Sequence, residues 1–364
     1  MRVAMIGTGY VGLVSGACFA DFGHEVTCVD RDGGKIDALK RGQIPIYEPG
    51  LSDLVSTNMR AGRLKFTTEL APAVSEANAV FIAVGTPSRR GDGHADLSFV
   101  YDAAREIAGA LEGFTVVITK STVPVGTGDE VERIIHETRP DCECAVASNP
   151  EFLREGAAIQ DFKHPDRIVV GTNNARAREI MNELYRPLYL NRSPILFTER
   201  RTAELIKYAA NAFLATKITF INEIADLAEK VGADVQDIAR GIGLDNRIGS
   251  KFLHAGPGYG GSCFPKDTLA LLKTGQDYEA PLRIVEAVVA VNDTRKRAMA
   301  RKVSAALHGD VRGKTIALLG LTFKPNTDHV RAAGHGGEGA RLRSGRREAG
   351  QAVRERRHFL QGCV

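Results

Sequence analysis

The sequence predicts an α/β fold in which a parallel sheet domain is followed by a central helical domain. A short apolar strand at residues 2–6 runs into a glycine-rich turn and then an apolar helix. Strand and helix patterns then alternate along the first half of the chain, and a long helical pattern covers residues 202–230. Such alternation is typical of parallel sheets, because each parallel strand needs a crossover connection.

The turn after the first strand reads Gly7-Thr8-Gly9-Tyr10-Val11-Gly12, and the helical stretch behind it runs to Phe22. Glycines at these positions allow a tight turn and let the backbone approach a pyrophosphate at the positive end of the helix. A second strand at residues 25–29 ends at Asp30, where a carboxylate binds the ribose of a dinucleotide. We therefore predict a Rossmann-like domain that prefers NAD to NADP, since an acid repels the 2′-phosphate.

Three further strands lead into polar turns: residues 78–84 into Gly85-Thr86-Pro87, residues 115–119 into Lys120-Ser121-Thr122, and residues 144–147 into Ser148-Asn149-Pro150-Glu151. The carboxyl ends of strands in an open parallel sheet form the edge where ligands bind. We therefore expect Thr86, Thr122 and Glu151 near the cofactor. The two threonines also suit a simpler role, the capping of the turns that follow them.

The helical pattern at residues 202–230 has apolar residues on most of its circumference, so we expect it to be buried on more than one side. Lys207 and Asn211 are four residues apart and share one face. A lysine in such a setting either extends its ammonium group to water or takes part in function. The pattern alone leaves both interpretations open.

A glycine-dense segment from Gly249 to Gly261 leads into Ser262-Cys263-Phe264-Pro265-Lys266-Asp267. Glycines at this density indicate a loop whose backbone approaches a ligand. Cys263 is either a structural thiol or a nucleophile. In the second case the nearby Lys266 would favour its thiolate form. Together with a hydride-accepting cofactor, a nucleophilic thiol suggests oxidation of an alcohol beyond the aldehyde.

The net charge of +4 is unevenly distributed along the 364 residues. Residues 329–364 hold eight Arg and three Glu, a net +5, which leaves −1 for the rest of the chain. This distribution gives little support to nucleic-acid binding by the main body.

The six cysteines show no disulfide framework, and the pair Cys142 and Cys144 lacks the further ligands of a metal site. Reduced thiols, a cytoplasmic location and no metal are therefore expected. Glycines interrupt the apolar residues 3–20, and no uninterrupted apolar run of about 18 residues occurs, so we expect neither a signal peptide nor a membrane span.

Several motifs follow one another along residues 1–328: Gly7 to Leu13, Tyr47-Glu48-Pro49-Gly50-Leu51, Ser121 to Thr127, Asn149 to Gly156, Lys207 with Asn211, Arg247-Ile248-Gly249, Tyr259 to Asp267, and Gly320 to Pro325. Together they resemble the UDP-glucose/GDP-mannose dehydrogenase family over some nine-tenths of the chain. So many motifs in one order make a chance resemblance negligible.

The resemblance implies NAD-dependent, four-electron oxidation of UDP-glucose to UDP-glucuronate without a metal. Cys263 would hold the substrate carbon first as a thiohemiacetal and then as a thioester. Lys207 and Asn211 would stabilise the developing oxyanion. Asp267 would take part in proton transfer and orient Lys207, while Glu151 and Thr122 would serve hydrolysis of the thioester.

The same resemblance implies the binding residues. For the cofactor they are Gly7, Gly9, Tyr10, Val11, Gly12, Asp30, Lys35, Thr86, Thr122, Glu155, Lys266 and Arg331. For the sugar nucleotide they are Glu151, Phe152, Leu153, Arg154, Glu155, Lys207, Asn211, Phe252, Leu253, His254, Ala255, Gly256, Gly260 and Lys324. Arg247 would reach the substrate of a neighbouring subunit, and the helix at 202–230 would form the core of a homodimer or a larger homo-oligomer.

We divide the chain into an NAD-binding domain at 1–200, a central helical dimerisation and catalytic domain at 201–300, the start of a UDP-binding α/β domain at 301–328, and a non-family basic tail at 329–364. A strand is expected at residues 315–319, but from His329 on the pattern changes to Arg, Gly, Ala and Glu. We interpret this tail as the product of a shifted reading frame, which resequencing of the coding DNA tests; a native basic tail is the alternative. With a truncated third domain, NAD binding should persist while substrate affinity falls.

Four other functions fit part of this pattern. GDP-mannose and UDP-N-acetylmannosamine dehydrogenases use the same chemistry on other sugar nucleotides. The chain also suits a catalytically inactive, NAD-binding dimer. A one-step β-hydroxyacid dehydrogenase has a similar two-domain arrangement, but it would stay active without Cys263.

Overall fold

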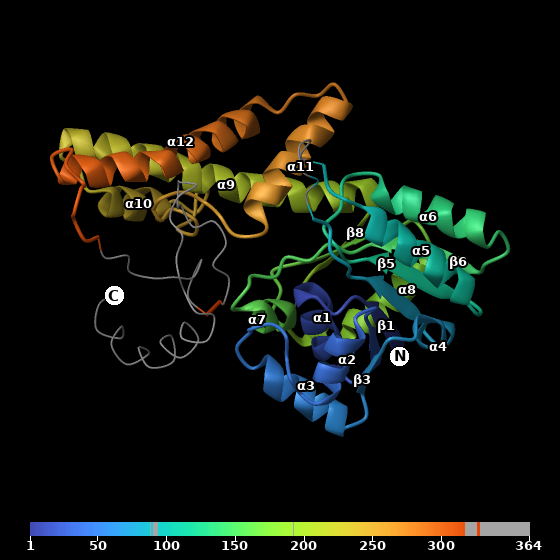
Figure 1. Cartoon of the computed structure of the whole chain (residues 1–364). Helices are drawn as coiled ribbons and strands as arrows, with labels where there is room; N and C mark the ends of the chain where they lie inside the picture. Colours follow the sequence, from blue (N-terminus) through green and yellow to red (C-terminus); the bar gives the residue numbers. More distant parts are fainter. Residues whose placement is uncertain (88, 90–93, 192, 317–325, 328–364) are drawn as a thin grey trace.

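The computed structural model describes residues 1–87, 89, 94–191, 193–316 and 326–327, and it places a sheet domain beside a layer of long helices (Figure 1). The strands are β1 (Arg2–Ile6), β2 (Glu25–Val29), β3 (Leu64–Thr67), β4 (Ala79–Ile82), β5 (Thr115–Thr119), β6 (Cys144–Ser148), β7 (Ile168–Gly171) and β8 (Ile195–Thr198). They form one sheet in the order β3-β2-β1-β4-β5-β6-β7-β8. All neighbours are parallel except β6 and β7, which meet antiparallel at Ser148 and Gly171.

Most helices of the first half cover the two faces of this sheet. They are α1 (Tyr10–Asp21), α2 (Gly33–Lys40), α3 (Leu51–Arg60), α4 (Leu70–Ser75), α5 (Ser98–Ala110), α6 (Thr127–Thr138), α7 (Ala158–Lys163), α8 (Ala175–Tyr185) and the 3₁₀ helix η1 (Arg186–Asn191). Side chains of a strand alternate between faces, so Val3 and Met5 of β1 pack in one core cluster, while Ala4 and Ile6 pack in the other. The predicted α/β class with a Rossmann-like first domain is confirmed.

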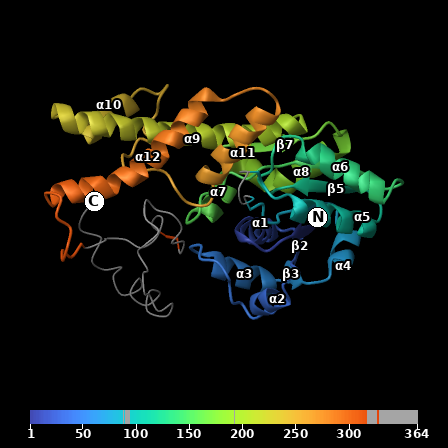
Figure 2. The same ribbon diagram turned by 45° about the horizontal axis from the view of Figure 1, so that its top comes forward.

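The helical layer contains α9 (Arg200–Val231), α10 (Val235–Gly243), α11 (Phe264–Asp277) and α12 (Arg283–Ala306). Helix α9 begins against the sheet domain and extends beyond it, with α10, α11 and α12 packed along its length (Figures 1 and 2). This one helix therefore connects the sheet domain to the rest of the described chain. Among the described residues, no helix combines the length and the apolar character that crossing a bilayer requires.

Several expected boundaries agree with the structure, and others differ. Strands β1, β2 and β5 have the predicted bounds, and α9 contains the predicted helix at 202–230. Strand β4 is shorter than residues 78–84, because its ladder ends where Ile82 pairs with Ile6, the last residue of β1.

The C-terminal expectations are mostly outside the described residues. Helix α12 continues through the expected domain boundary at residue 300. Of the strand expected at 315–319, Thr315 and Ile316 are described and lie in no strand, since no described strand pairs with them. Residues 317–319, Lys324, Arg331 and the tail at 329–364 lie outside the described residues, so the interpretations placed there remain predictions.

Candidate active site

The turn between β1 and α1 forms a cradle at the carboxyl edge of the sheet. Gly7 has a φ of +103°, and a Cβ on it would lie 2.6 Å from the carbonyl oxygen of Ala83. A Cβ on Gly12 would lie 2.0 Å from the carbonyl oxygen of Gly7, so neither position accepts a side chain. A Cβ on Gly9 would meet nothing within 4 Å. The space beside Gly9 lies at the N-terminus of α1, whose free N–H groups suit a pyrophosphate.

Asp30 stands directly after β2, beside this cradle. Its Oδ2 accepts hydrogen bonds from the backbone N–H of Thr8 at 2.9 Å, the Thr8 hydroxyl at 2.6 Å and Lys35 Nζ at 2.8 Å. Burial opposes ionisation, but the bonds from Lys35 and Thr8 lower the pKa of Asp30 to about 2. The ionised carboxylate of Asp30 fits the ribose hydroxyls of NAD, and the glycine cradle beside it fits the pyrophosphate. Sequence reasoning missed Thr8, although it lies inside the fingerprint.

Thr86 and Thr122 meet where the loops after β4 and β5 converge. The Thr86 hydroxyl donates to the carbonyl oxygen of Thr122 at 3.0 Å. Ser121 fastens the same two loops, because its hydroxyl donates to the Val84 carbonyl oxygen at 2.6 Å. Both predicted threonines are therefore side by side, with the Thr86 hydroxyl bonded to the neighbouring loop. Their capping of the turns that follow them stays a prediction.

Lys207 of α9 and Glu151 of the loop after β6 form a buried ion pair. Lys207 Nζ lies 3.1 Å from Glu151 Oε1, and the two side chains are only 5% and 7% exposed. Burial disfavours the ammonium group, but the carboxylates of Glu151 and Asp267 outweigh it and raise the pKa of Lys207. Of the two interpretations left open by the sequence, the snorkelling lysine is wrong, because this ammonium group is enclosed by protein.

Asn211 lies one turn further along α9 and binds Asp267 of α11. Its Nδ2 donates to Asp267 Oδ2 at 2.6 Å, and both residues are buried. The other oxygen of Asp267 lies 2.9 Å from Lys266 Nζ. That contact is an ion pair by distance, since neither atom completes a well-aligned hydrogen bond among the described residues. Asp267 was expected to orient Lys207, but the direct partner of Lys207 is Glu151, which approaches from the sheet domain.

Cys263 is the N-cap residue of α11, immediately before Phe264 and Pro265. A helix N-terminus favours a thiolate, but burial and the neighbouring carboxylate of Glu151 raise the pKa of Cys263. The cation that counteracts them is Lys207, whereas the sequence pointed to Lys266, which is paired with Asp267. Cys263, Lys207, Asp267 and Glu151 thus lie within electrostatic reach of one another although they come from three separate segments.

A second cluster anchors the loop after Glu151. Tyr10, which with Val11 opens α1, donates its hydroxyl hydrogen to Glu48. Glu48 accepts the backbone N–H of Gly156 at 2.8 Å and that of Ala158 at 2.7 Å. The buried Glu48 therefore fixes the segment that carries Glu155, to whose carboxylate Ser262 donates at 2.9 Å, next to Cys263. The sequence quoted Glu48 as part of a motif but gave it no role.

The remaining predicted residues of this segment point to other partners. Phe152 stacks under the guanidinium of Arg167, at 3.9 Å from ring centroid to Cζ, and lies 5.3 Å from Lys207 Nζ. The backbone N–H of Leu153 donates to Glu151 Oε2 at 2.5 Å. Arg154 forms an ion pair with Asp161 at 2.6 Å, so its charge is engaged within the sheet domain.

The loop predicted to bind the sugar nucleotide is held by α9 and α12. Asn222 accepts the backbone N–H of Gly256 at 2.8 Å, and Arg295 donates to the Gly256 carbonyl oxygen at 2.5 Å. Leu253 and Gly260 are buried, Phe252 and Ala255 are half-buried, and His254 is exposed. Arg247 is 89% exposed and pairs with Asp245 in its own turn. The supporting pair Asn222 and Arg295 was missed by sequence reasoning.

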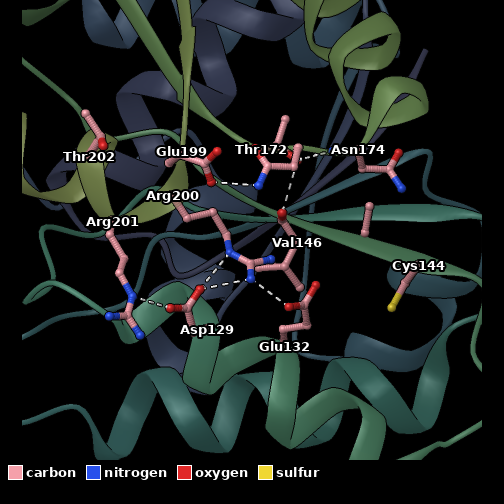
Figure 3. Close-up of a pocket in the computed structure, with 12 residues that line it drawn as sticks. Asp129, Glu132, Cys144, Val146, Thr172, Asn174, Glu199, Arg200, Arg201 and Thr202 are labelled. Carbon is pink, nitrogen blue, oxygen red and sulfur yellow. Dashed lines mark hydrogen bonds and ion pairs between the residues drawn. The ribbon is translucent and has the colours of Figure 1, made fainter.

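A cavity of about 660 Å³ contains none of the predicted site residues (Figure 3). It is lined by residues of α6, β6, the segment after β7 and the start of α9, and each of its charged side chains has a polar partner in the same lining. Arg200 lies 2.9 Å from Asp129 and 2.6 Å from Glu132, and Asn173 donates to Glu199 at 2.6 Å. Because these charges are already paired, the cavity is a weaker candidate site than the cluster around Cys263.

The parallel sheet, the glycine cradle and the ionised Asp30 define a dinucleotide-dependent oxidoreductase. Comparison with known proteins agrees: residues 1–189 match the NAD binding domain of the UDP-glucose/GDP-mannose dehydrogenase family, and residues 201–294 match its central domain. The chain belongs to this family.

Individual relatives cover most of the chain. It is 74% identical over 333 residues to the UDP-glucose 6-dehydrogenase of Rhizobium meliloti, spanning 91% of this chain and 76% of that protein. It is 52% identical to the UDP-glucose 6-dehydrogenase YwqF of Bacillus subtilis, over 92% and 75% of the two chains. A solved UDP-glucose dehydrogenase from Pyrobaculum islandicum superposes with a TM-score of 0.86 at 43% identity, over 90% and 76%.

Proposed function

We propose that this chain oxidises UDP-glucose to UDP-glucuronate with two molecules of NAD, through a covalent intermediate on Cys263. The observation that supports it most is the convergence of Cys263, Lys207, Asn211, Asp267 and Glu151, taken together with the relatives that carry the UDP-glucose 6-dehydrogenase name. NAD, when bound, supplies the hydride acceptor for both oxidation steps.

The first stage converts the C6 alcohol to a thiohemiacetal. The hydroxyl proton leaves with the help of Asp267, as hydride departs from C6. Cys263 Sγ then adds to the aldehyde carbon, and the thiol proton passes to the C6 oxygen. Lys207 and Asn211 stabilise the negative charge on the C6 oxygen. Each has donors to spare, because the ammonium group offers three N–H groups and the amide two, while one of each is bound to Glu151 and Asp267 respectively.

The second stage releases the acid. Loss of a second hydride from C6 and of the hydroxyl proton turns the thiohemiacetal into a thioester, and water then cleaves the C–S bond to give a carboxylate, the free thiol and a proton. Glu151 and Thr122 position and activate that water. The sum is one UDP-glucose, two NAD and one water in, and one UDP-glucuronate, two NADH and three protons out.

The test is the amount of NADH formed per UDP-glucose consumed, measured at 340 nm with wild-type protein. Two NADH per substrate is the expected result, and one would point to a simple alcohol dehydrogenase. Cys263→Ala should abolish the second NADH, whereas a structural cysteine would leave the stoichiometry unchanged. GDP-mannose and UDP-N-acetylmannosamine in parallel reactions separate the related specificities, and NAD binding without turnover of any substrate would favour the inactive dimer.

We further propose that α9 forms a homodimer, which would allow Arg247 to reach a neighbouring site. Phe213, Phe220 and Leu227 recur every seven residues along α9 and are 66%, 50% and 56% exposed. A stripe of large apolar side chains on one helix face is typical of an interface. Phe220→Asp should halve the mass measured by light scattering. Leu196→Asp on the edge strand β8, where Leu196 is 50% exposed, is the matched control and should not.

A cytoplasmic location is also part of this proposal. The five described cysteines are free thiols. A catalytic thiol must stay reduced, and the cytoplasm maintains that state. Cell fractionation with an antibody to the chain tests the location directly.

A further inference from the structure

Glu204 is a buried carboxylate on α9, three residues before Lys207, that no sequence motif singled out. Its side chain is 3% exposed. Its Oε2 accepts the backbone N–H of Gly126 at 2.7 Å, and its Oε1 accepts the backbone N–H of Gly128 at 2.8 Å and the Ser148 hydroxyl at 3.0 Å. Within the described part of the chain it forms no ion pair, so burial raises the pKa of Glu204, and only the backbone and hydroxyl donors counteract that effect.

These bonds cap α6 from a different helix. The N-cap residue of α6, Gly126, has a φ of +93° and provides no side-chain hydrogen bond. Glu204 takes that role, and its charge is favoured by the positive end of α6. A Cβ on Gly128 would lie 2.9 Å from Glu204 Oε1, so the carboxylate comes this close because residue 128 is glycine.

The capped loop carries Thr122 and leads to the proposed catalytic groups. A small cavity of about 10 Å³ is lined by Thr119, Ser121, Thr122, Val123, Ser148, Pro150, Glu204 and Lys207. Ser148, the third donor to Glu204, ends β6 three residues before Glu151. One carboxylate therefore joins the helix of Lys207, the loop of Thr122 and the strand that precedes Glu151.

We propose that Glu204 is a positioning residue of this active site, which holds the Thr122 loop and the Glu151 segment in register with Lys207. The inference rests on the proposed function, because it assigns Glu204 a part in the same reaction. Misplacement of reacting groups by 1 Å lowers rates by about 100-fold. Loss of the Glu204 bonds should therefore reduce turnover more than it reduces substrate binding.

The experiment compares Glu204→Gln with two companion variants. In Glu204→Gln one acceptor becomes an NH₂ group that faces a backbone N–H, so we expect kcat to fall about 10- to 100-fold while KM for UDP-glucose changes by less than about threefold. Glu204→Asp keeps the charge and should recover part of the lost kcat. Ser148→Ala removes one neutral hydrogen bond and should lower kcat by about fivefold.

Glu132→Gln is the matched control. Glu132 also joins α6 to α9, through an ion pair of 2.6 Å with Arg200, but it makes no bond to the Thr122 loop. Its kcat should stay within about twofold of wild type, since a partly exposed ion pair adds little. An equal loss in Glu132→Gln and Glu204→Gln would overturn the inference, because general helix docking would then explain both.

Hydrogen exchange gives a second readout that needs no turnover. The amides of Gly126 and Gly128 should exchange at least about tenfold faster in Glu204→Gln than in wild type, and at the wild-type rate in Glu132→Gln. Unchanged exchange together with unchanged kcat in Glu204→Gln would refute the proposal. If the wild type makes no NADH, the proposed function fails. The exchange comparison then still shows whether Glu204 holds the N-terminus of α6 and the Thr122 loop in place. If Glu204→Gln does not fold, Glu204→Asp and Ser148→Ala provide the same comparison.

Discussion

Replacement of Lys207 by Met tests the buried ion pair most directly. Lys207 Nζ lies 3.1 Å from Glu151 Oε1, and both side chains are at most 7% exposed. At an effective dielectric constant of 20, two unit charges at this distance attract by about 5 kcal/mol. Removal of one partner leaves a buried, uncompensated charge, so the free energy of unfolding should fall by about 3–5 kcal/mol.

The double variant Lys207→Met, Glu151→Gln separates stability from chemistry. With both charges removed, the free energy of unfolding should return to within about 2 kcal/mol of wild type. Turnover should stay at least about 100-fold below wild type, because the proposed oxyanion donor and the carboxylate proposed to activate water are both missing.

Urea unfolding monitored by tyrosine fluorescence gives the stabilities, and NADH formation gives the rates. Recovery of stability without recovery of turnover is the expected pair of results. The ion-pair reasoning would be refuted if Lys207→Met were as stable as wild type. It would also be refuted if the double variant lost as much free energy of unfolding as Lys207→Met and Glu151→Gln lose together.

Three further predictions concern the cofactor cradle and the thiol. Gly12→Ala should lower the free energy of unfolding by about 2 kcal/mol or more in urea unfolding, because its Cβ would meet the Gly7 carbonyl oxygen at 2.0 Å. In Gly9→Ala the added Cβ meets nothing within 4 Å, so this variant should keep wild-type stability and weaken NAD binding in fluorescence titration. The pKa of Asp30 is lowered to about 2, so its contribution of about 2 kcal/mol to the free energy of unfolding is present above pH 4 and is lost as the pH falls toward 2. Asp30→Asn should lose less stability between pH 4 and pH 2 than the wild type, and identical stability profiles in acid would contradict this. Burial raises the pKa of Cys263 above the ordinary thiol value of 9.0, so its alkylation by iodoacetamide, followed by mass spectrometry, should still accelerate above pH 9, and a plateau below pH 8 would oppose it.

Local sequence patterns were sufficient for the elements that bear the cofactor cradle. The apolar run at residues 2–6, the glycine turn and the strand ending at Asp30 each depend on neighbours in sequence, and the structure has them at the predicted residues. Strand β4 was predicted too long, because its two partners, β1 and β5, both end level with Ile82, whereas its own apolar residues continue to Val84.

The residues around Cys263 show where this reasoning stopped. Their identities came from motifs, but their partners did not. Lys207 was paired with Asp267 in the sequence interpretation, whereas in the structure Glu151 approaches it across the boundary between the sheet and α9. No sequence pattern indicates that residues 151 and 207 are in contact.

The sequence by itself determined the α/β class and the NAD-binding fingerprint, which follow from periodicity and glycine placement and are therefore local. The catalytic roles of Cys263 and Lys207 came only from the resemblance to a known family, since the residues alone left both open. The tertiary structure decided which charges meet, how deeply Lys207 is buried, and that Glu204 caps α6 from another helix. These are properties of contacts between segments distant in sequence, and both burial and hydrogen-bond geometry exist only once the segments have packed.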